Sequence, residues 1–147
     1  MVGLRAFRPE DAEILREALF PQSEIGEVRA LFKEWDARSF EGRYFEMFAV
    51  ERDGRLVGSA SLYEHSPSVV SAGVEIFPAE KGQGSGGAAL GLLVGAAAEK
   101  GYRIVQDQVR PDNLASVRLH EACGFETDGY VYRNKKGQDV ILFLRAL

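Results

Sequence analysis

A glycine-rich segment in the middle of the chain has the composition of a phosphate-binding loop. Residues 82–87 read Gly-Gln-Gly-Ser-Gly-Gly, between a short apolar run that ends at Pro78 and a segment rich in alanine. The first amides of a helix have no partner within it, the helix dipole is positive there, and glycines let an anion approach the backbone. A strand, this loop and a helix in succession would therefore bind a phosphate or a diphosphate.

Two nucleotide-binding folds use similar loops, and the sequence disfavours both. Residues 82–87 satisfy G-x-G-x-x-G, and Asp107 follows about twenty residues later, where a ribose-binding acid is expected. Residues 78–81 separate this loop from its strand, however, and the chain that follows is too short to complete a doubly wound sheet. A P-loop is excluded because no Gly-Lys-Ser/Thr follows at the required spacing.

A second group of polar residues has the spacing of one helix face. Asn113, Ser116 and His120 stand at i, i+3 and i+7, so their side chains share a side of the helix. Histidine, with an ordinary pKa of about 6.5, is a competent acid or base near neutral pH. His120 could therefore donate a proton or an N–H hydrogen bond; the alternative is a solvated helix histidine without a catalytic role.

The composition bounds the architecture and the partners. With 147 residues, 46% hydrophobic and 27% charged, the chain is expected to form one globular domain over residues 1–147. A net charge of -4 without a basic run argues against nucleic acid and leaves room for a cationic partner. One cysteine allows no internal disulfide, and one cysteine with two histidines is too few for a zinc site. No signal peptide or membrane span is evident, so we expect a cytoplasmic protein.

Apolar periodicity and turn residues predict the elements that hold these groups. Strands are predicted over residues 2–8, 44–51, 56–63, 69–77, 102–109, 125–132 and 140–144. Helices are predicted from 9 to 20, from 24 to 38, from the glycine loop to Lys100 with a stop at Gly101, and from Asp112 or Asn113 to Cys123. The order β-α-α-β-β-β-α-β-α-β-β indicates a mixed sheet with helices on its faces.

The loop and the polar helix together resemble the acyl-CoA-binding core of the GNAT superfamily of N-acetyltransferases. The family loop, Arg/Gln-x-x-Gly-x-Gly/Ala, follows a strand that ends apolar-x-Pro. This chain has Ile-Phe-Pro at residues 76–78 and Lys-Gly-Gln-Gly-Ser-Gly at residues 81–86. The family's later helix opens with an Asn and ends Leu-Tyr-Glu-x-x-Gly-Phe, which matches Asn113 and the Leu-His-Glu-Ala-Cys-Gly-Phe of residues 119–125. The resemblance is specific over residues 74–125, and the order of elements agrees elsewhere.

The resemblance implies acetyl-CoA as the acyl donor and a set of residues that bind it. Lys81 and the loop amides would hold the diphosphate, although lysine lacks the planar two-point recognition of the family's arginine. The backbone of residues 74–76 would pair with pantetheine like an added strand. Asn113 would hydrogen-bond the same arm, or only cap its helix. The implied binding set is Val74, Glu75, Ile76, Lys81, Gly82, Gln83, Gly84, Ser85, Gly86, Gly87, Asn113 and Ser116.

Acetyl transfer needs a neutral amine, a donor for the oxyanion and a proton for the thiolate. In similar family members a tyrosine often gives that proton, and His120 occupies its place here. Some members carry a glutamate base where this chain has Gln108, which cannot accept a proton. We therefore expect His120 as the acid and Glu75 as the base, unless the Glu75 side chain simply points to water. A water chain touching Glu64 or His65 is an alternative base, and a backbone N–H near Ile76 is the expected oxyanion donor.

The sequence thus predicts an α/β (α+β) GNAT-like domain with a mostly antiparallel sheet of about six or seven strands and about four helices. The resemblance implies an N-acetyltransferase that moves an acetyl group from acetyl-CoA to a primary amine of a small molecule or peptide. Because two catalytic positions differ, a non-catalytic acyl-CoA-binding or sensing domain is the alternative. We expect no metal, nucleic-acid or membrane partner, and the resemblance leaves a homodimer open. In the family the acceptor pocket corresponds to residues 20–45 and 63–68, which carry no motif.

Overall fold

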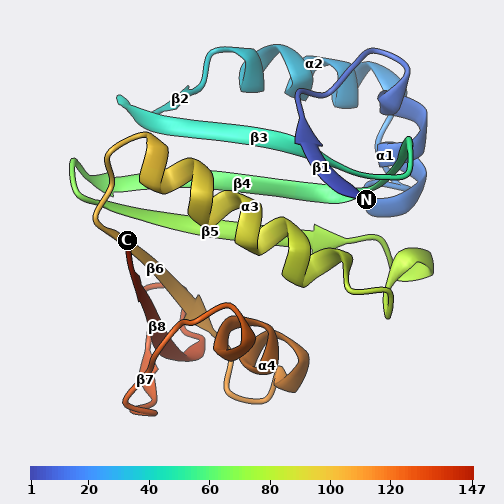
Figure 1. The fold of residues 1–147 in the computed structure, drawn as a ribbon. Helices are drawn as coiled ribbons and strands as arrows, with labels where there is room; N and C mark the ends of the chain where they lie inside the picture. Colours follow the sequence, from blue (N-terminus) through green and yellow to red (C-terminus); the bar gives the residue numbers. More distant parts are fainter.

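The computed structural model describes residues 1–147 and contains one mixed sheet of eight strands with four α-helices (Figure 1). The strands are β1 (Val2–Arg5), β2 (Ser39–Phe40), β3 (Arg43–Arg52), β4 (Arg55–Ser66), β5 (Val69–Ile76), β6 (Ile104–Val109), β7 (Tyr132–Arg133) and β8 (Asp139–Ala146). The helices are α1 (Asp11–Leu19), α2 (Ile25–Asp36), α3 (Ser85–Glu99) and α4 (Leu114–Ala122), with a 3-10 turn, η1 (Pro78–Glu80).

The strand order is β1-β3-β4-β5-β6-β8-β7, and the short β2 pairs with β3. All pairs are antiparallel except β5 with β6. The predicted fold class is therefore confirmed. The sheet has more strands than predicted because β2 and β7 are pairs of residues too short to produce a periodic signal.

Two apolar clusters cover the two faces of the sheet. Adjacent residues of β3 and β4 divide between them: Ala49 and Leu56 pack with α1 and α2, whereas Val50 and Val57 pack with α3. Side chains of neighbouring strand residues point to opposite faces, so the helices form layers on both sides of the sheet. None of the helices combines the length and the apolar character that crossing a bilayer requires.

Helix α3 lies along β4 and β5 (Figure 1), and its buried residues belong to the larger of the two apolar clusters. Its buried stripe contains Ala89, Leu90, Leu93 and Ala97, so small residues let the helix approach the sheet closely. The helix starts after Gly84, whose φ of 80° is left-handed. It ends before Gly101, with a φ of 90°, which confirms the predicted stop.

The prediction of a strand over residues 125–132 is wrong. Glu126 forms an isolated bridge to Leu144, and the next residue that pairs is Tyr132, where β7 begins. Between them, Thr127 Oγ1 accepts from the amide of Gly129 and Asp128 Oδ1 accepts from that of Tyr130, at 3.1 and 2.9 Å. Side chains that bond nearby amides favour turns over a strand ladder.

The first strand is also shorter than the predicted 2–8, because it ends at Arg5. The buried carboxylate of Asp11 accepts hydrogen bonds from the Arg5 guanidinium and from the amide of Arg8. These bonds turn the chain out of the sheet and into α1.

Candidate active site

Strands β5 and β6 form a fork. They pair through only two rungs, Val69 with Ile104 and Val70 with Val105, and then diverge (Figure 1). Beyond these rungs the edge of β5 that faces β6 has no strand partner. The fork separates the large antiparallel part of the sheet from the smaller part formed by β6, β8 and β7.

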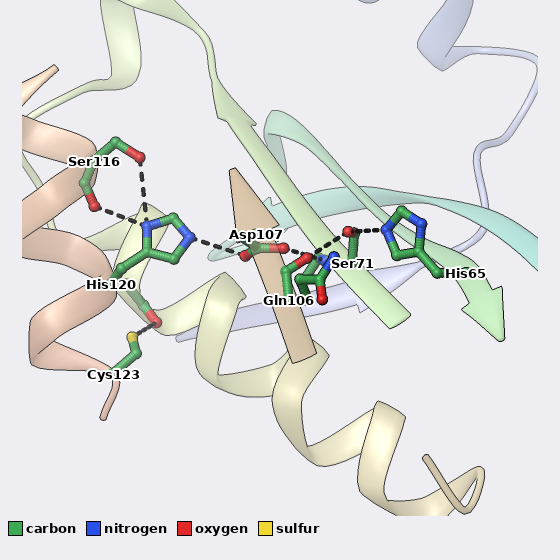
Figure 2. A network of polar contacts seen from close by, with 9 residues as sticks. His65, Ser71, Gln106, Asp107, Ser116, His120 and Cys123 are labelled. Carbon is green, nitrogen blue, oxygen red and sulfur yellow. Dashed lines mark hydrogen bonds and ion pairs between the residues drawn. The ribbon is translucent and has the colours of Figure 1, made fainter. Parts of the chain in front are cut away.

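Side chains replace the backbone ladder where the fork opens (Figure 2). At the next register position the Ser71 hydroxyl donates to the carbonyl of Gln106, at 2.5 Å. One residue further, the amide of Ala72 donates to Oδ1 of Asp107, at 2.8 Å. Each strand thus bonds to the other through an inserted side chain, which holds the strands apart at the base of the fork.

Backbone groups of β5 line the open fork. The amide of Ala72 points toward β6, and strand alternation gives Val74 and Ile76 the same direction. The peptide groups of Glu75 instead face β4, where this residue pairs with Ser59. Two of the three residues predicted to bind pantetheine therefore offer free N–H and C=O groups.

A groove of about 390 Å³ runs from the glycine loop along this edge to α4. It is lined by every residue of the predicted CoA-binding set except Gln83, and also by His120. At its loop end, Gly82 and Gly84 both have left-handed φ angles, of 84° and 80°. The amides that open α3 follow directly, so this end of the groove has the predicted anion-binding geometry.

Arg52, which the sequence does not indicate as a functional residue, stabilises the glycine loop through hydrogen bonds. Arg52, at the end of β3, donates from Nη1 to the carbonyl of Gln83 at 2.5 Å and to Oγ of Ser85 at 3.1 Å. These bonds turn the Gln83 carbonyl toward β3. No local pattern around Arg52 indicates this contact, because it joins residues 31 apart in the chain.

His120 is buried at the opposite end of the groove, with 7% of its surface exposed. Nδ1 lies 2.8 Å from the carbonyl of Ser116 and Nε2 lies 2.9 Å from Oδ2 of Asp107 (Figure 2). A carbonyl only accepts, so Nδ1 carries a hydrogen. The ring packs edge-on against Phe125 and beside Phe143.

This arrangement favours the charged ring. Burial lowers the pKa of His120, but the hydrogen bond to Asp107, the Ser116 carbonyl and the Asp107 charge outweigh burial and raise the pKa above its ordinary 6.5. Asp107 is itself 5% exposed and bonds both β5 and α4. The two residues form a buried histidine–carboxylate pair that joins β5, β6 and α4 at the fork.

The other polar candidates lie apart from this pair. Asn113 caps α4, with Oδ1 accepting from the amide of Ser116 at 3.2 Å. Glu75 is exposed on the face of β5 away from α3, and no protein group bonds its carboxylate. Glu64 accepts from the hydroxyl of Tyr102 at 2.7 Å and is therefore occupied.

A second groove, of about 830 Å³, opens on the face of the fork away from α3. Gln106, Gln108 and His65 line it, as do Asn113 and Ser116, which also line the first groove. Of the segments 20–45 and 63–68, expected to form the acceptor pocket, only His65 contributes. The grooves meet at the start of α4, so two ligands could reach the fork from opposite faces.

Comparisons with known proteins agree with this geometry. The family model described as an acetyltransferase (GNAT) domain matches residues 2–126. A comparison with curated protein sequences returned no match.

Solved structures share the fold at low sequence identity. RimL, the ribosomal L7/L12 alpha-N-protein acetyltransferase, in complex with coenzyme A, superposes with a TM-score of 0.84 at 19% identity, over 99% of this chain and 94% of that one. The yncA protein of Salmonella typhimurium with acetyl-CoA gives 0.74 at 21%, over 100% and 94%. Spermidine N-acetyltransferase from Vibrio cholerae, with CoA and spermine, gives 0.79 at 19%, over 99% and 95%.

The family model covers most of the chain, and the fold superposes on these structures over 94–95% of their length. The family, the fold and the class of enzyme predicted from the sequence are confirmed. This protein belongs to the GNAT acetyltransferase domain family.

Proposed function

We propose that the protein transfers an acetyl group from acetyl-CoA to a primary amine of a small molecule or peptide. The observation that carries this proposal is the open edge of β5, which leads from the glycine loop to the Asp107–His120 pair. CoA or acetyl-CoA is bound in the three structures described above, which have the same fold. The residues of the groove fit that molecule: loop amides suit its diphosphate, and unpaired strand groups suit its amide-containing arm.

In this proposal, Lys81 and the amides of residues 82–87 bind the diphosphate. The free peptide groups of Val74 and Ile76 bond the pantetheine arm. The thiol end then lies toward the base of the fork, next to His120. The amide of Ala72 is already bonded to Asp107, so the Val74 amide, rather than that of Ile76, is the nearest free donor for the oxyanion.

We assign His120 the role of proton source for the leaving thiolate. Asp107 and the Ser116 carbonyl raise the pKa of His120 above its ordinary 6.5, which favours the charged ring that can donate a proton. Both ring nitrogens are engaged, by Asp107 and Ser116, so the proton can leave only when one of these bonds opens. Glutamine at position 120 keeps one donor for Asp107 but has no proton to give. We expect His120→Gln to lower kcat on the order of 100-fold or more, with little change in acetyl-CoA affinity; an unchanged kcat would remove His120 from the mechanism.

We assign the second groove to the acceptor. Its lining is basic although the whole chain is acidic. Arg110, Arg133, Lys135 and Lys136 line it, no carboxylate does, and neither lysine has an ion-pair partner. RimL acts on a ribosomal protein and the Vibrio cholerae enzyme on spermidine, so the family fold alone does not choose an acceptor. The local charge favours an amine that also carries a carboxylate or phosphate over a polyamine.

A panel of amines tests the function. Purified protein with acetyl-CoA should release free thiol with at least one primary amine, and amino acids or acidic peptides should exceed spermidine. Calorimetric binding of acetyl-CoA without thiol release from any amine would favour the alternative, a non-catalytic acyl-CoA-binding domain. Two observations support that alternative. Both ring nitrogens of His120 already have hydrogen-bond partners, and Gln108, which accepts from Asn134 at 2.9 Å, cannot act as a base.

A further inference from the structure

The chain has two histidines, and both lie at the base of the fork (Figure 2). His120 reaches Asp107 from the side of α3 and α4. His65 reaches Ser71, whose side chain lies on the other face, because its neighbours Val70 and Ala72 are in the α3 core. The proposed function uses the first histidine and leaves the second without a role.

His65 sits at an irregularity of β4. Glu64 pairs with Val70 and Ser66 with Val69, so His65 is the extra residue of a β-bulge. Bulges often lie next to active sites, where they redirect a side chain. The ring is exposed, lines the second groove and stands edge-on to Tyr63, with centroids 5.3 Å apart.

Hydrogen-bond geometry fixes which nitrogen of His65 carries the hydrogen. The Ser71 hydroxyl has a single hydrogen and donates it to the carbonyl of Gln106. Nε2 of His65, 2.5 Å from the same hydroxyl oxygen, must therefore be the donor in their bond. In the neutral ring Nδ1 is then unprotonated, and no protein group bonds it. A free imidazole lone pair thus adjoins the second groove.

The next step rests on the proposed function, because it uses the direction of the bound thioester. Pantetheine that pairs with Val74 and Ile76 directs its thiol end toward residues 71 and 72. Ser71, and with it His65, lies at that end. Glu75 lies four residues further along β5, or about 13 Å at about 3.3 Å per residue, beside the pantetheine arm.

We propose that His65 is the general base that deprotonates the acceptor amine, and that Ser71 is the positioning residue that fixes its tautomer. Nδ1 takes a proton from the ammonium form of the acceptor and later returns it to water. The nitrogen lone pair attacks the thioester carbonyl carbon, the C–N bond forms and the C–S bond breaks. His120 gives its proton to the departing thiolate. The acceptor nitrogen loses its second proton as the amide forms, and this proton reprotonates His120.

Steady-state kinetics of thiol release test this assignment with the most active amine of the panel. His65→Gln keeps an N–H donor for Ser71 but removes the base. We expect it to lower kcat about 100-fold or more and to leave acetyl-CoA affinity, measured by calorimetry, within twofold. Added imidazole should restore part of the activity of His65→Ala, which a structural role would not allow. Ser71→Ala should lower kcat less, and Ser71→Thr, which keeps the hydroxyl, should recover it.

Ser68→Ala is the matched control, because Ser68 is exposed in the same hairpin and its hydroxyl makes no hydrogen bond. It should match the wild-type protein. If His65→Gln retains full activity, or if Glu75→Gln rather than His65→Gln loses it, the assignment of the base is overturned and acetyl transfer stands. A wild-type protein that binds acetyl-CoA but acetylates no amine would overturn both proposals.

Discussion

At the scale of single residues, the site depends on side chains that take over backbone bonds. The carboxylate of Asp107 accepts from the Ala72 amide, where a strand carbonyl would otherwise be, and also bonds Nε2 of His120. No buried side-chain polar atom lacks a partner. A buried pair of this kind is costly to break but specifies geometry, here the angle between β5, β6 and α4.

The Asp107–His120 pair makes stability depend on pH. Because the folded-state pKa of His120 is raised above 6.5, the fold binds this proton more tightly than the unfolded chain does. The stabilisation is fully present below pH 6.5 and is lost as the pH rises through the folded pKa. We therefore expect the free energy of unfolding in urea to fall as the pH is raised from 6 to 9.

Asp107→Asn is the control for that experiment. Asparagine can accept from the Ala72 amide through Oδ1 and donate from Nδ2 to a neutral His120, so both bonds survive without a charge. The variant should fold and should lose the alkaline decline in stability. An equal decline in the wild type and the variant would show that this pair is not its source.

Residue roles could be predicted from the sequence only where the signal is local. The Asn113 cap, the glycine loop and the placing of His120 on the groove come from short spacings. Arg52 and Ser71 could not be predicted, because their contacts depend on strand pairing between distant segments. The sequence offers His65 only as a group that a water chain could touch, because the β-bulge that turns its ring toward Ser71 depends on the register between β4 and β5.

At the scale of elements, glycines decide how closely strands and helices approach. Gly58 in β4 faces Ile76 across the strand pair, and an added Cβ would lie 2.4 Å from the carbonyl oxygen of Glu75. Gly91 in α3 is exposed, and an added Cβ would meet nothing within 4 Å. The same residue type is thus required at one position and only tolerated at the other.

These two positions give opposite expectations for the same substitution. Gly58→Ala should lower the free energy of unfolding by about 1–3 kcal/mol, because backbone cannot move away as a side chain can. Gly91→Ala should raise it by about 0.5–1 kcal/mol through the better helix propensity of alanine. Urea denaturation measures both, and a neutral Gly58→Ala would contradict the close packing of β4 on β5.

Most elements could be predicted from periodicity, and the exceptions have physical causes. The hairpin turn at residues 53–54 and the helix stop at Gly101 follow from residue types with clear backbone preferences. Aromatic and β-branched residues at the ends of the segment 125–132 favour a strand, yet its Thr and Asp side chains bond its own amides. These local side-chain bonds compete with strand pairing, and the positions of apolar residues alone do not predict them.

At the scale of the whole molecule, the fork leaves one edge of β5 without a strand partner beyond Val70. Unpaired peptide groups of β5 and the amides at the start of α3 would gain partners from acetyl-CoA. A ligand at 100 times its Kd stabilises the native state by about 2.7 kcal/mol. For a chain of 147 residues this corresponds to a rise in Tm of about 5–10 °C.

The glycine loop should control that rise in Tm. Valine at position 84 is strained at a φ of 80° and would crowd the loop amides. We expect Gly84→Val to lose most of the shift that saturating acetyl-CoA produces, whereas Gly91→Ala, on the exposed side of α3, should keep it. A full shift in Gly84→Val would place the binding site elsewhere.

Amide hydrogen exchange, followed by NMR with and without saturating acetyl-CoA, tests the central claim most directly. If pantetheine completes the fork, exchange at Val74 and Ile76 should slow by about tenfold or more, as it does for amides that gain a strand partner. The amide of Ala72, already bonded to Asp107, should change least. Unchanged exchange at Val74 and Ile76 in protein saturated with acetyl-CoA would contradict the account.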